Sequence, residues 1–360
     1  MMWFGREFSS EMPSNSRFFW QAKGTVAALE HLRPSAQALE ARDVTLAIAD
    51  DVSSSHRLIV AALAGGKIIG DLRLVATRDD VVIGGIQSVF GSDSLSGHYA
   101  LVRRRFRLPR YRRGTALLLG AANSDNYYHW LLDSLPRWKM LQAAGWREYD
   151  FLLLHGRPRR FQDETLDWLG VPAVRRLRCS KNFVHQFERL VVPAMPFTRQ
   201  AVPAWAVAWL RSLVPQKRPG PKRVYLSRRG VGGRKLLNEA ELLAALEPYG
   251  FLAVQAENLS MTEQAGCVGS ARFILAPHGA ALANMVFAPP GTGIVELFHP
   301  RHKNRCYENL AAVCGHRYAC LDGIAIERKR NRRLEYTVDV AAVLECLERM
   351  QLKPAQKWGG

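Results

Sequence analysis

The sequence of 360 residues lacks several patterns that assign a class of protein directly. No apolar run reaches the roughly 20 residues that a membrane-spanning helix needs; the best runs, 58–66 and 201–210, are too short. Residues 1–16 contain no apolar core of a secretion signal. The six cysteines form no C-x-x-C pair, so we expect free thiols in a reducing compartment. His299 and His302 form an H-x-x-H pair with no further ligand set beside it, and we expect both at the surface.

Common nucleotide and hydrolase motifs are absent as well. The chain has no D-x-D, no G-x-x-x-x-G-K-[ST], no G-x-G-x-x-G after a strand and no G-x-S-x-G. The usual acidic clamp for a metal–diphosphate complex is therefore missing. A diphosphate bound by this chain would be neutralised by arginine and by a helix dipole.

Acidic residues are scarce relative to basic ones, 32 against 50, which leaves a net charge of +18. Such a charge favours an anionic partner. Basic clusters at 103–113 and 328–333 carry most of the excess. One alternative function is nucleic-acid binding, although no helix-turn-helix, zinc-finger or RNA-recognition motif is present. Another is a non-catalytic peripheral membrane scaffold, with Trp20, Trp205 and Trp209 beside basic loops.

Length and composition predict two domains. Three prolines in 214–221 cannot continue a helix or a central strand, so we place the linker there. Beyond the linker, short apolar strands alternate with helices, which is typical of a parallel sheet covered on both faces. We expect an N-terminal α/β domain with a β-rich start over 1–214 and a Rossmann-like domain over 215–337. A C-terminal helix within 338–360 is expected to pack back on the N-terminal domain.

The periodicity predicts particular elements. The expected strands of the N-terminal part are 44–49, 57–62, 67–69, 81–83, 100–104, 115–119, 151–154 and 189–192, and its helices are 127–141, 161–169 and 205–213. The expected strands of the C-terminal part are 224–226, 251–254, 273–276, 294–297 and 317–320, and its helices are 239–249, 260–271, 280–285, 304–315 and 338–350.

A polar stripe opens the expected helix 127–141, at the carboxyl end of a strand where α/β sheets place ligands. On an α-helix Asn126, His129 and Asp133 share one face. A histidine and a carboxylate one turn apart can act as proton acceptor and orienting group. The alternative is a capped helix that carries a surface His–Asp pair. Pro136 is expected to kink or end the helix.

Basic and small residues follow the strands of the second domain. Arg228 and Arg234 lie beside glycines, which suits a diphosphate, although a solvated basic loop is the alternative. Gly279 and three alanines begin a helix with free N–H donors, and His278 precedes them; tight helix–sheet packing is the alternative. Glu296 is expected to end a strand and to accept hydrogen bonds from ribose hydroxyls.

Two acidic residues follow the expected strand 251–254. Glu257 is expected to contact the nucleotide or Arg228. Glu263 forms an S-x-x-E capping box with Ser260, which we interpret as structural.

Taken in order, six motifs resemble glycosyltransferase family 61. They are N-Y-Y-H-W-x-x-D-x-L-P-R (126–137), Y-L-S-R-R (225–229), R-K-L-L-N-E (234–239), G-F-x-x-V-x-x-E-x-L-S-x-x-E-Q (250–264), A-P-H-G-A-A-L-A-N-M-x-F-A-P-P-G-T (276–292) and V-E-L-F (295–298). The resemblance covers residues 126–318, and the N-terminal third lies outside it.

The resemblance implies an inverting glycosyltransferase of the GT-B type, with two Rossmann-like domains facing a cleft. The missing acidic clamp predicts that it works without a metal. It implies a nucleotide-sugar donor, a UDP-sugar above others, and no cofactor. The implied acceptor is a glycan or lipid-linked glycan of capsule or lipopolysaccharide synthesis. The composition and the missing signal core predict a cytoplasmic protein, and the basic clusters predict a peripheral place at the anionic inner membrane face. Nucleic acid is not an expected partner.

The resemblance also assigns residues. Asp133 is the preferred base and His129 the orienting group, with the reverse assignment open; Asn126 and Arg137 are expected on the acceptor side. The residues expected to bind the donor are Ser227, Arg228, Arg234, Glu257, His278, Gly279, Ala280, Asn284 and Glu296.

Overall fold

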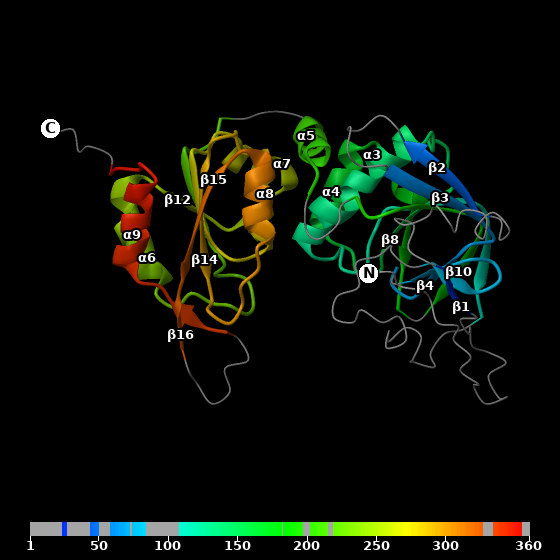
Figure 1. The fold of residues 1–360 in the computed structure, drawn as a ribbon, viewed down its shortest axis with the longest axis horizontal. Coiled ribbons are helices and arrows are strands. Elements are labelled where there is room, and N and C mark those ends of the chain that lie inside the picture. Colours follow the sequence, from blue (N-terminus) through cyan, green and yellow to red (C-terminus); the bar gives the residue numbers. More distant parts are fainter. Residues whose placement is uncertain are drawn as a thin grey trace. The chain divides into compact units, whose positions relative to one another are not determined.

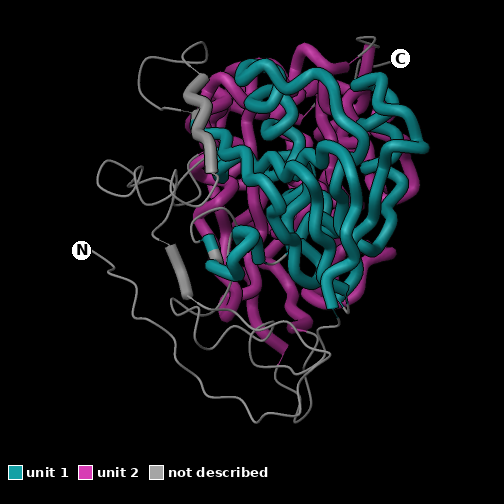
Figure 2. Tube along the Cα trace, turned by 90° about the vertical axis from the view of Figure 1, so that its right-hand side faces the viewer, with its two compact units in different colours: residues 1–198 teal, residues 199–360 magenta. Residues whose placement is uncertain are grey.

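A computed structural model of the protein describes residues 24–26, 44–49, 58–83 without 73, 108–196 without 182, 202–214, 219–326 and 334–354. The chain divides into two compact units, Met1–Thr198 and Arg199–Gly360 (Figure 2). Each is a mixed α/β unit that contains parallel strands. The expected strand 100–104 and the basic residues 103–107 and 328–333 lie outside the described residues.

Unit 1 is built on a sheet in which ten strands are described. They are β1 (Gly24–Val26), β2 (Val44–Ala49), β3 (Leu58–Ala64), β4 (Lys67–Ile69), β5 (Leu74–Ala76), β6 (Val81–Ile83), β7 (Arg110–Leu118), β8 (Phe151–His155), β9 (Arg176–Cys179) and β10 (Val184–Pro193). Their order is β1-β6-β5-β4-β10-β7-β8-β9, with β3 paired to β10 and β2 to β3. The pairs among β10, β7, β8 and β9 are parallel.

Helical crossovers connect the parallel strands of unit 1, as parallel pairing requires. Between β7 and β8 a π-helix, His129–Ser134, continues into α3, Leu135–Ala143. Between β8 and β9 lie α4, Arg160–Trp168, and the short 3₁₀ helix Ala173–Arg175. The carboxyl end of β7 therefore leads directly into the predicted polar stripe.

The core of unit 1 is an apolar cluster contributed by its strands, among them Ala116 and Leu118 of β7. In β10 the cluster takes Phe187, then Leu190 and Val192. This change from odd to even positions coincides with a register shift between residues 187 and 189. A bulge adds one residue to a strand, so the alternation of its faces shifts by one.

Unit 2 contains a five-stranded parallel sheet in the order β12-β11-β13-β14-β15. Its strands are β11 (Arg223–Leu226), β12 (Leu252–Val254), β13 (Phe273–Pro277), β14 (Gly293–Phe298) and β15 (Arg317–Asp322). The strand order is 2-1-3-4-5, so the winding of the chain reverses between β11 and β13. This is the topological switch point of a doubly wound sheet.

Helices cover both faces of the sheet in unit 2. Figure 1 shows α6 (Glu239–Leu246) and α9 (Val340–Arg349) on one face and α7 (Met261–Gly269) and α8 (Cys306–Cys314) on the other. The remaining helices are α5 (Ala204–Leu213) and the 3₁₀ segments η5 (Glu247–Tyr249), η6 (Ala256–Asn258) and η7 (Ala280–Phe287). A two-stranded sheet of β16 (Ile324–Ala325) and β17 (Tyr336–Thr337) completes it. No helix in the described ranges has the length and hydropathy for a membrane span.

Two features of unit 2 differ from the predicted domain plan. The predicted boundary was 214/215, but α5 belongs to unit 2, where the Arg211 side chain donates to the carbonyls of Val286 and Ala288. The C-terminal helix α9 was expected to pack on the N-terminal domain. Its buried residues Val343 and Leu347 instead join the apolar cluster of unit 2, because their i, i+4 spacing presents one stripe to α6.

Strand alternation places polar groups on the face of the sheet opposite α6 and α9. Val295 and Leu297 of β14 join the apolar cluster on the α6 and α9 face. Glu296, between them, therefore points to the other face, toward η7 and α8.

Candidate functional site

A set of polar residues gathers at the carboxyl edge of the sheet in unit 2. Ser227 and Arg228 follow β11, and His278 and Gly279 follow β13. These two strands are hydrogen-bonded neighbours at the switch point. The connections leave the sheet there toward opposite faces, which opens a crevice where doubly wound proteins bind ligands.

Arg228 is the most informative residue of this edge. Its side chain is only 8% exposed, yet its Nε has no hydrogen-bond partner. Burial and the positive charge of Arg234 lower the pKa of Arg228 below its ordinary value. A buried guanidinium N–H without an acceptor is costly, so this group indicates an anionic ligand.

Gly279 leaves the space in which Arg228 lies. A Cβ at residue 279 would stand 1.9 Å from Nη1 of Arg228. The φ of Gly279 is 178°, an extended conformation open to any residue, so space rather than backbone geometry requires glycine here. The carbonyl of Gly279 accepts a hydrogen bond of 2.6 Å from the Tyr307 hydroxyl. This contact fixes the turn that leads into η7.

Arg234 brings a second guanidinium toward the same place. It has a φ of 50°, in the left-handed region that residues other than glycine seldom adopt. Its charge lowers the pKa of both Arg228 and His302. A non-glycine residue held in this conformation is a sign of functional strain. Two arginines therefore repel one another at one edge of the sheet, and the same positive charge disfavours protonation of His302.

The prediction that His299 and His302 lie at the surface is wrong. His299 is buried and His302 half-buried, because the chain turns back over the sheet after β14. The His302 ring lies 5.2 Å from the His278 ring. Burial first, then the charges of Arg234 and His278, lower the pKa of His302. The sequence carried a signal for this residue, since the H-x-x-H pair follows a strand at its carboxyl end.

Glu296 lies beneath this edge and not in it. It is 0% exposed and sits within β14, where its Oε1 is 2.5 Å from Nδ1 of His278. Its Oε2 accepts a hydrogen bond of 2.5 Å from the Tyr318 hydroxyl of β15. Both carboxylate oxygens are thus engaged by protein groups. This arrangement does not fit the expected contact with a ribose and instead connects Glu296 to His278.

Three further residues that were predicted to bind the sugar donor make different kinds of contact. The Ser227 hydroxyl donates to Glu239 over 2.8 Å, and the buried Asn284 amide donates to Gln264 over 3.0 Å. Both residues therefore have internal partners that hold the loops in place. Glu257 is exposed on η6, and its negative charge raises the pKa of Arg228. Its contact with the nucleotide or with Arg228 stays a prediction.

The chain after Gly279 forms the 3₁₀ helix η7, where an α-helix was predicted over 280–285. The N–H of Leu282 donates to the Gly279 carbonyl as its first bond. The N–H of Ala280, one residue inside the helix, has no intrahelical acceptor by this geometry. Ala280 therefore offers a backbone donor one residue after Gly279, against which Arg228 lies. The predicted capping box of Ser260 and Glu263 is confirmed at the start of α7.

Unit 1 contains the predicted His–Asp pair in an altered helix. Nδ1 of His129 is 2.7 Å from Oδ2 of Asp133. The turn between them is a π-helix, which widens the backbone ahead of Pro136 at the start of α3. Proline cannot donate the next helical hydrogen bond, and π-turns occur frequently at functional sites. Asp133 is only 3% exposed, whereas His129 is half-buried, so the pair is not a surface pair.

Asn126 and Arg137 support this pair. The Asn126 side chain accepts a hydrogen bond from the Tyr128 N–H, which makes it a cap of the helix. Arg137 is fully buried and donates to the Gly120 carbonyl over 2.9 Å. Burial lowers the pKa of Arg137 to about 10, against the opposing effect of Asp133. Arg137 stays charged at neutral pH, and its place on the acceptor side stays a prediction.

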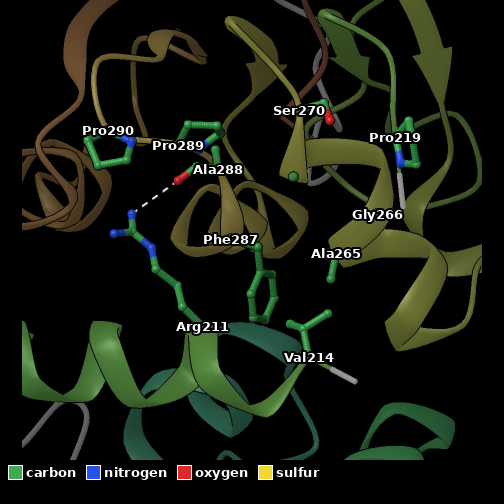
Figure 3. A pocket seen from close by; sticks show the side chains of 11 residues that line it. Arg211, Val214, Pro219, Ala265, Gly266, Ser270, Phe287, Ala288, Pro289 and Pro290 are labelled. Atoms are coloured by element: carbon green, nitrogen blue, oxygen red, sulfur yellow. Dashed lines mark hydrogen bonds between the residues drawn. The ribbon is translucent and has the colours of Figure 1, made fainter. Parts of the chain in front are cut away.

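A cavity of about 550 Å³ lies at the opposite edge of the sheet in unit 2. Pro219, Ser270 and Pro289 line it, each shortly before a strand begins. Figure 3 shows Phe287 and Val214 beside it, and Arg211 bonded to the Ala288 carbonyl. Its lining is mainly apolar, and its one arginine already has carbonyl partners. The anion-binding groups therefore lie elsewhere, at the carboxyl edge. Among the residues that the structure describes, no cluster of His, Cys, Asp or Glu suits a metal ion.

The fold and these groups define a class: a doubly wound α/β protein with cationic side chains converging at its switch point. Residues 127–295, just under half of the chain, match the family model Glycosyltransferase 61. That stretch contains both the His129–Asp133 pair and the Arg228–Gly279 edge.

Curated relatives agree with the family match. The EGF domain-specific O-linked N-acetylglucosamine transferase of Drosophila melanogaster is 39% identical over 113 residues, 30% of this chain and 21% of that protein. The protein of the same name from Gallus gallus is 31% identical over 122 residues, 31% of this chain and 22% of that protein. The chain thus spans about a fifth of the length of these relatives. The match and the relatives support a glycosyltransferase.

Proposed function

We propose that the protein is an inverting glycosyltransferase that takes its sugar from a nucleotide-sugar, with the diphosphate bound at the carboxyl edge of unit 2. The buried Arg228, whose Nε lacks a protein partner, is the observation that carries this proposal. A diphosphate supplies the missing anion and accepts charge-assisted hydrogen bonds from the guanidinium. Arg234 and the Ala280 N–H contribute the remaining positive potential.

Arg228, Arg234 and the Ala280 N–H take the role that a metal ion has in other diphosphate sites. Charge develops on the leaving diphosphate in the transition state, and fixed cations and N–H donors stabilise it there. This makes the proposed transfer independent of a metal. No organic cofactor enters the reaction, because the nucleotide is part of the donor substrate.

We assign the base to His129 rather than to Asp133. Asp133 is the more deeply buried partner, and its Oδ2 already faces Nδ1 of His129. With Nδ1–H directed at the carboxylate, Nε2 of His129 is the atom that accepts the proton of an acceptor hydroxyl. Asp133 then orients the ring and stabilises its charged form.

The proposed transfer uses a base from unit 1 and a donor site from unit 2. The acceptor oxygen loses its proton to His129 and attacks the anomeric carbon from the side opposite the diphosphate, which inverts the configuration. This requires the GT-B arrangement, in which the two units face one another across a cleft. The arrangement is part of the proposal.

For the sugar and the acceptor, the relatives offer a specific hypothesis. Their names describe transfer of N-acetylglucosamine to EGF domains, so we propose UDP-N-acetylglucosamine as the donor. A protein hydroxyl is one proposed acceptor. The other is a glycan or lipid-linked glycan of the bacterial cell surface, met in the cytoplasm at an anionic membrane face that attracts the basic chain.

Two measurements test the proposal. A ligand that binds only the folded state raises the melting temperature, so UDP and UDP-N-acetylglucosamine should stabilise the protein more than GDP or CMP does. Transfer of labelled N-acetylglucosamine to an EGF domain or to a membrane glycan fraction then distinguishes the two acceptors. Absence of stabilisation by every nucleoside diphosphate would remove the proposed donor site.

A further inference from the structure

Three hydrogen-bonded polar side chains run across the strands of unit 2 to the carboxyl edge of its sheet. The Tyr318 hydroxyl donates to Glu296, and Glu296 accepts from Nδ1 of His278, both over 2.5 Å. Glu296 is fully buried in β14 and so is shielded from water. A buried carboxylate is tolerated only when its oxygens have donors. Here one donor comes from β15 and the other from the end of β13.

The position of each proton in this hydrogen-bonded series of side chains can be assigned. Burial, followed by the negative charge of Glu296, raises the pKa of Tyr318, so its phenol keeps its proton. Glu296 consequently accepts on both oxygens, and Nδ1 of His278 carries the proton between the two residues. The remaining ring nitrogen, Nε2, lies across the ring from Glu296 and is the atom available to a ligand.

His278 is also held rigidly from its faces and edges. Its ring stacks on Phe298 at 5.1 Å and meets the rings of Tyr307 and His302 edge-on at 5.4 and 5.2 Å. Arg228 lies against the next residue, Gly279. The charged and titratable groups beside His278 or its neighbours Gly279 and His302 are Glu296, Tyr318, His302, Tyr307, Arg228 and Arg234. All of these except Glu296 are cationic or neutral.

We propose that His278 is a catalytic proton donor to the leaving diphosphate, and that Glu296 and Tyr318 are positioning residues that hold its ring with Nε2–H toward that diphosphate. This inference rests on the proposed function and deepens it.

The reaction balances as follows. The acceptor oxygen gives its proton to His129 and forms the new bond to the anomeric carbon. The bond from that carbon to the diphosphate oxygen breaks, and its electron pair stays on the diphosphate. The Nε2 proton of His278 passes to the departing oxygen, which neutralises the developing charge. His278 recovers a proton from solvent, and His129 releases one.

Calorimetry with UDP at pH 8 tests the proposal. At this pH a phosphate group has lost its second proton, whose pKa is near 6, and an ordinary imidazole is neutral. Titrations in buffers of different ionisation enthalpy report the protons taken up on binding. Wild type should take up a large fraction of one proton, His278→Gln and Glu296→Gln should lose this uptake, and His302→Gln should keep it. Uptake lost in His302→Gln but kept in His278→Gln overturns the proposal.

The rate of UDP-N-acetylglucosamine consumption gives a second readout. His278→Gln should lower the turnover by about 100-fold or more, and Glu296→Gln by at least about 10-fold, with little change in KM. Tyr318→Phe retains the carboxylate, so it provides a milder test if Glu296→Gln does not fold. Wild-type turnover in Glu296→Gln or in a folded Tyr318→Phe contradicts the positioning role. Failure of wild type to bind UDP contradicts the donor site itself, which is a distinct outcome.

Discussion

The guanidinium of Arg228 occupies the space that a side chain on Gly279 would fill, with a Cβ standing 1.9 Å from Nη1. One residue follows β11 and the other follows β13, so the contact joins the two strands at the switch point. Nη1 lies at the far end of the flexible Arg228 side chain, so an added methyl group would displace that side chain rather than the backbone.

Gly279→Ala is therefore expected to retain the fold and lose the ligand. The φ of 178° suits alanine, so the melting temperature should change little. Displacing Arg228 removes a charge-assisted hydrogen bond of about 1.5–3 kcal/mol, or roughly 10- to 100-fold in UDP affinity. Calorimetric titration of UDP checks this. An unchanged dissociation constant would show that Arg228 does not contact the diphosphate from this position.

Adjacent arginines provide a matched pair of variants. Arg229 donates to the buried Glu239 over 2.8 Å, whereas Nε of Arg228 has no partner. Arg228→Ala should abolish UDP binding with little loss of stability, because it removes a buried guanidinium whose Nε has no partner. Arg229→Ala should lower the free energy of unfolding by about 1–3 kcal/mol and keep UDP affinity, because Glu239 loses a donor. Denaturant melts and UDP titrations of both variants measure this. The reverse pattern would contradict the assignment of Arg228 as the ligand.

The pair in unit 1 should affect chemistry and not donor binding. His129→Gln removes the base, and Asp133→Asn removes the group that fixes its ring 2.7 Å away. Each should lower kcat by about 10²–10⁴-fold, with UDP affinity unchanged. Steady-state kinetics with UDP-N-acetylglucosamine check this. Near-normal turnover in Asp133→Asn, alongside a large loss in His129→Gln, would limit Asp133 to a structural role.

Stability should depend on pH through His185 in unit 1. Burial, followed by the charges of Arg112 and Arg110, lowers its pKa from 6.5 to about 4. Between these values the unfolded chain binds more protons, so this contribution is complete above pH 6.5 and decreases as pH falls toward 4. Unfolding free energy should fall by about 1–3 kcal/mol over this range. In His185→Gln the unfolding free energy should fall by that much less over the same pH range, as denaturant melts would measure. Equal pH dependence in the variant and in wild type would contradict this prediction.

Much of unit 2 could be predicted because its signals are local. Short apolar strands, each followed by a helix, predicted a parallel sheet, and β11, β13 and β14 lie within a residue of the expected ranges. Arg228 and Gly279 were found in the same way, since each directly follows a strand. The position of each residue directly after a strand therefore predicted that the two lie at one edge.

Other features depend on packing between distant segments. The alternation of side chains along β14 decides that Glu296 points beneath the carboxyl edge of the sheet. Its partner Tyr318 comes from β15. His302 reaches the edge only because the chain folds back after β14. The strand β9 was missed because arginines alternate with its apolar residues. The π-turn at His129 arises from the demand of Pro136 on the backbone, which no helical periodicity encodes.

The central claim is that the carboxyl edge of unit 2 binds a diphosphate through Arg228. Calorimetric titration of UDP and of uridine, in wild type and in Arg228→Ala, tests it most directly. The diphosphate should strengthen wild-type binding over uridine by about 100-fold or more, as several charge-assisted hydrogen bonds would, and this advantage should collapse in Arg228→Ala. Equal binding of UDP and uridine by wild type, or an advantage that survives in Arg228→Ala, would contradict the claim.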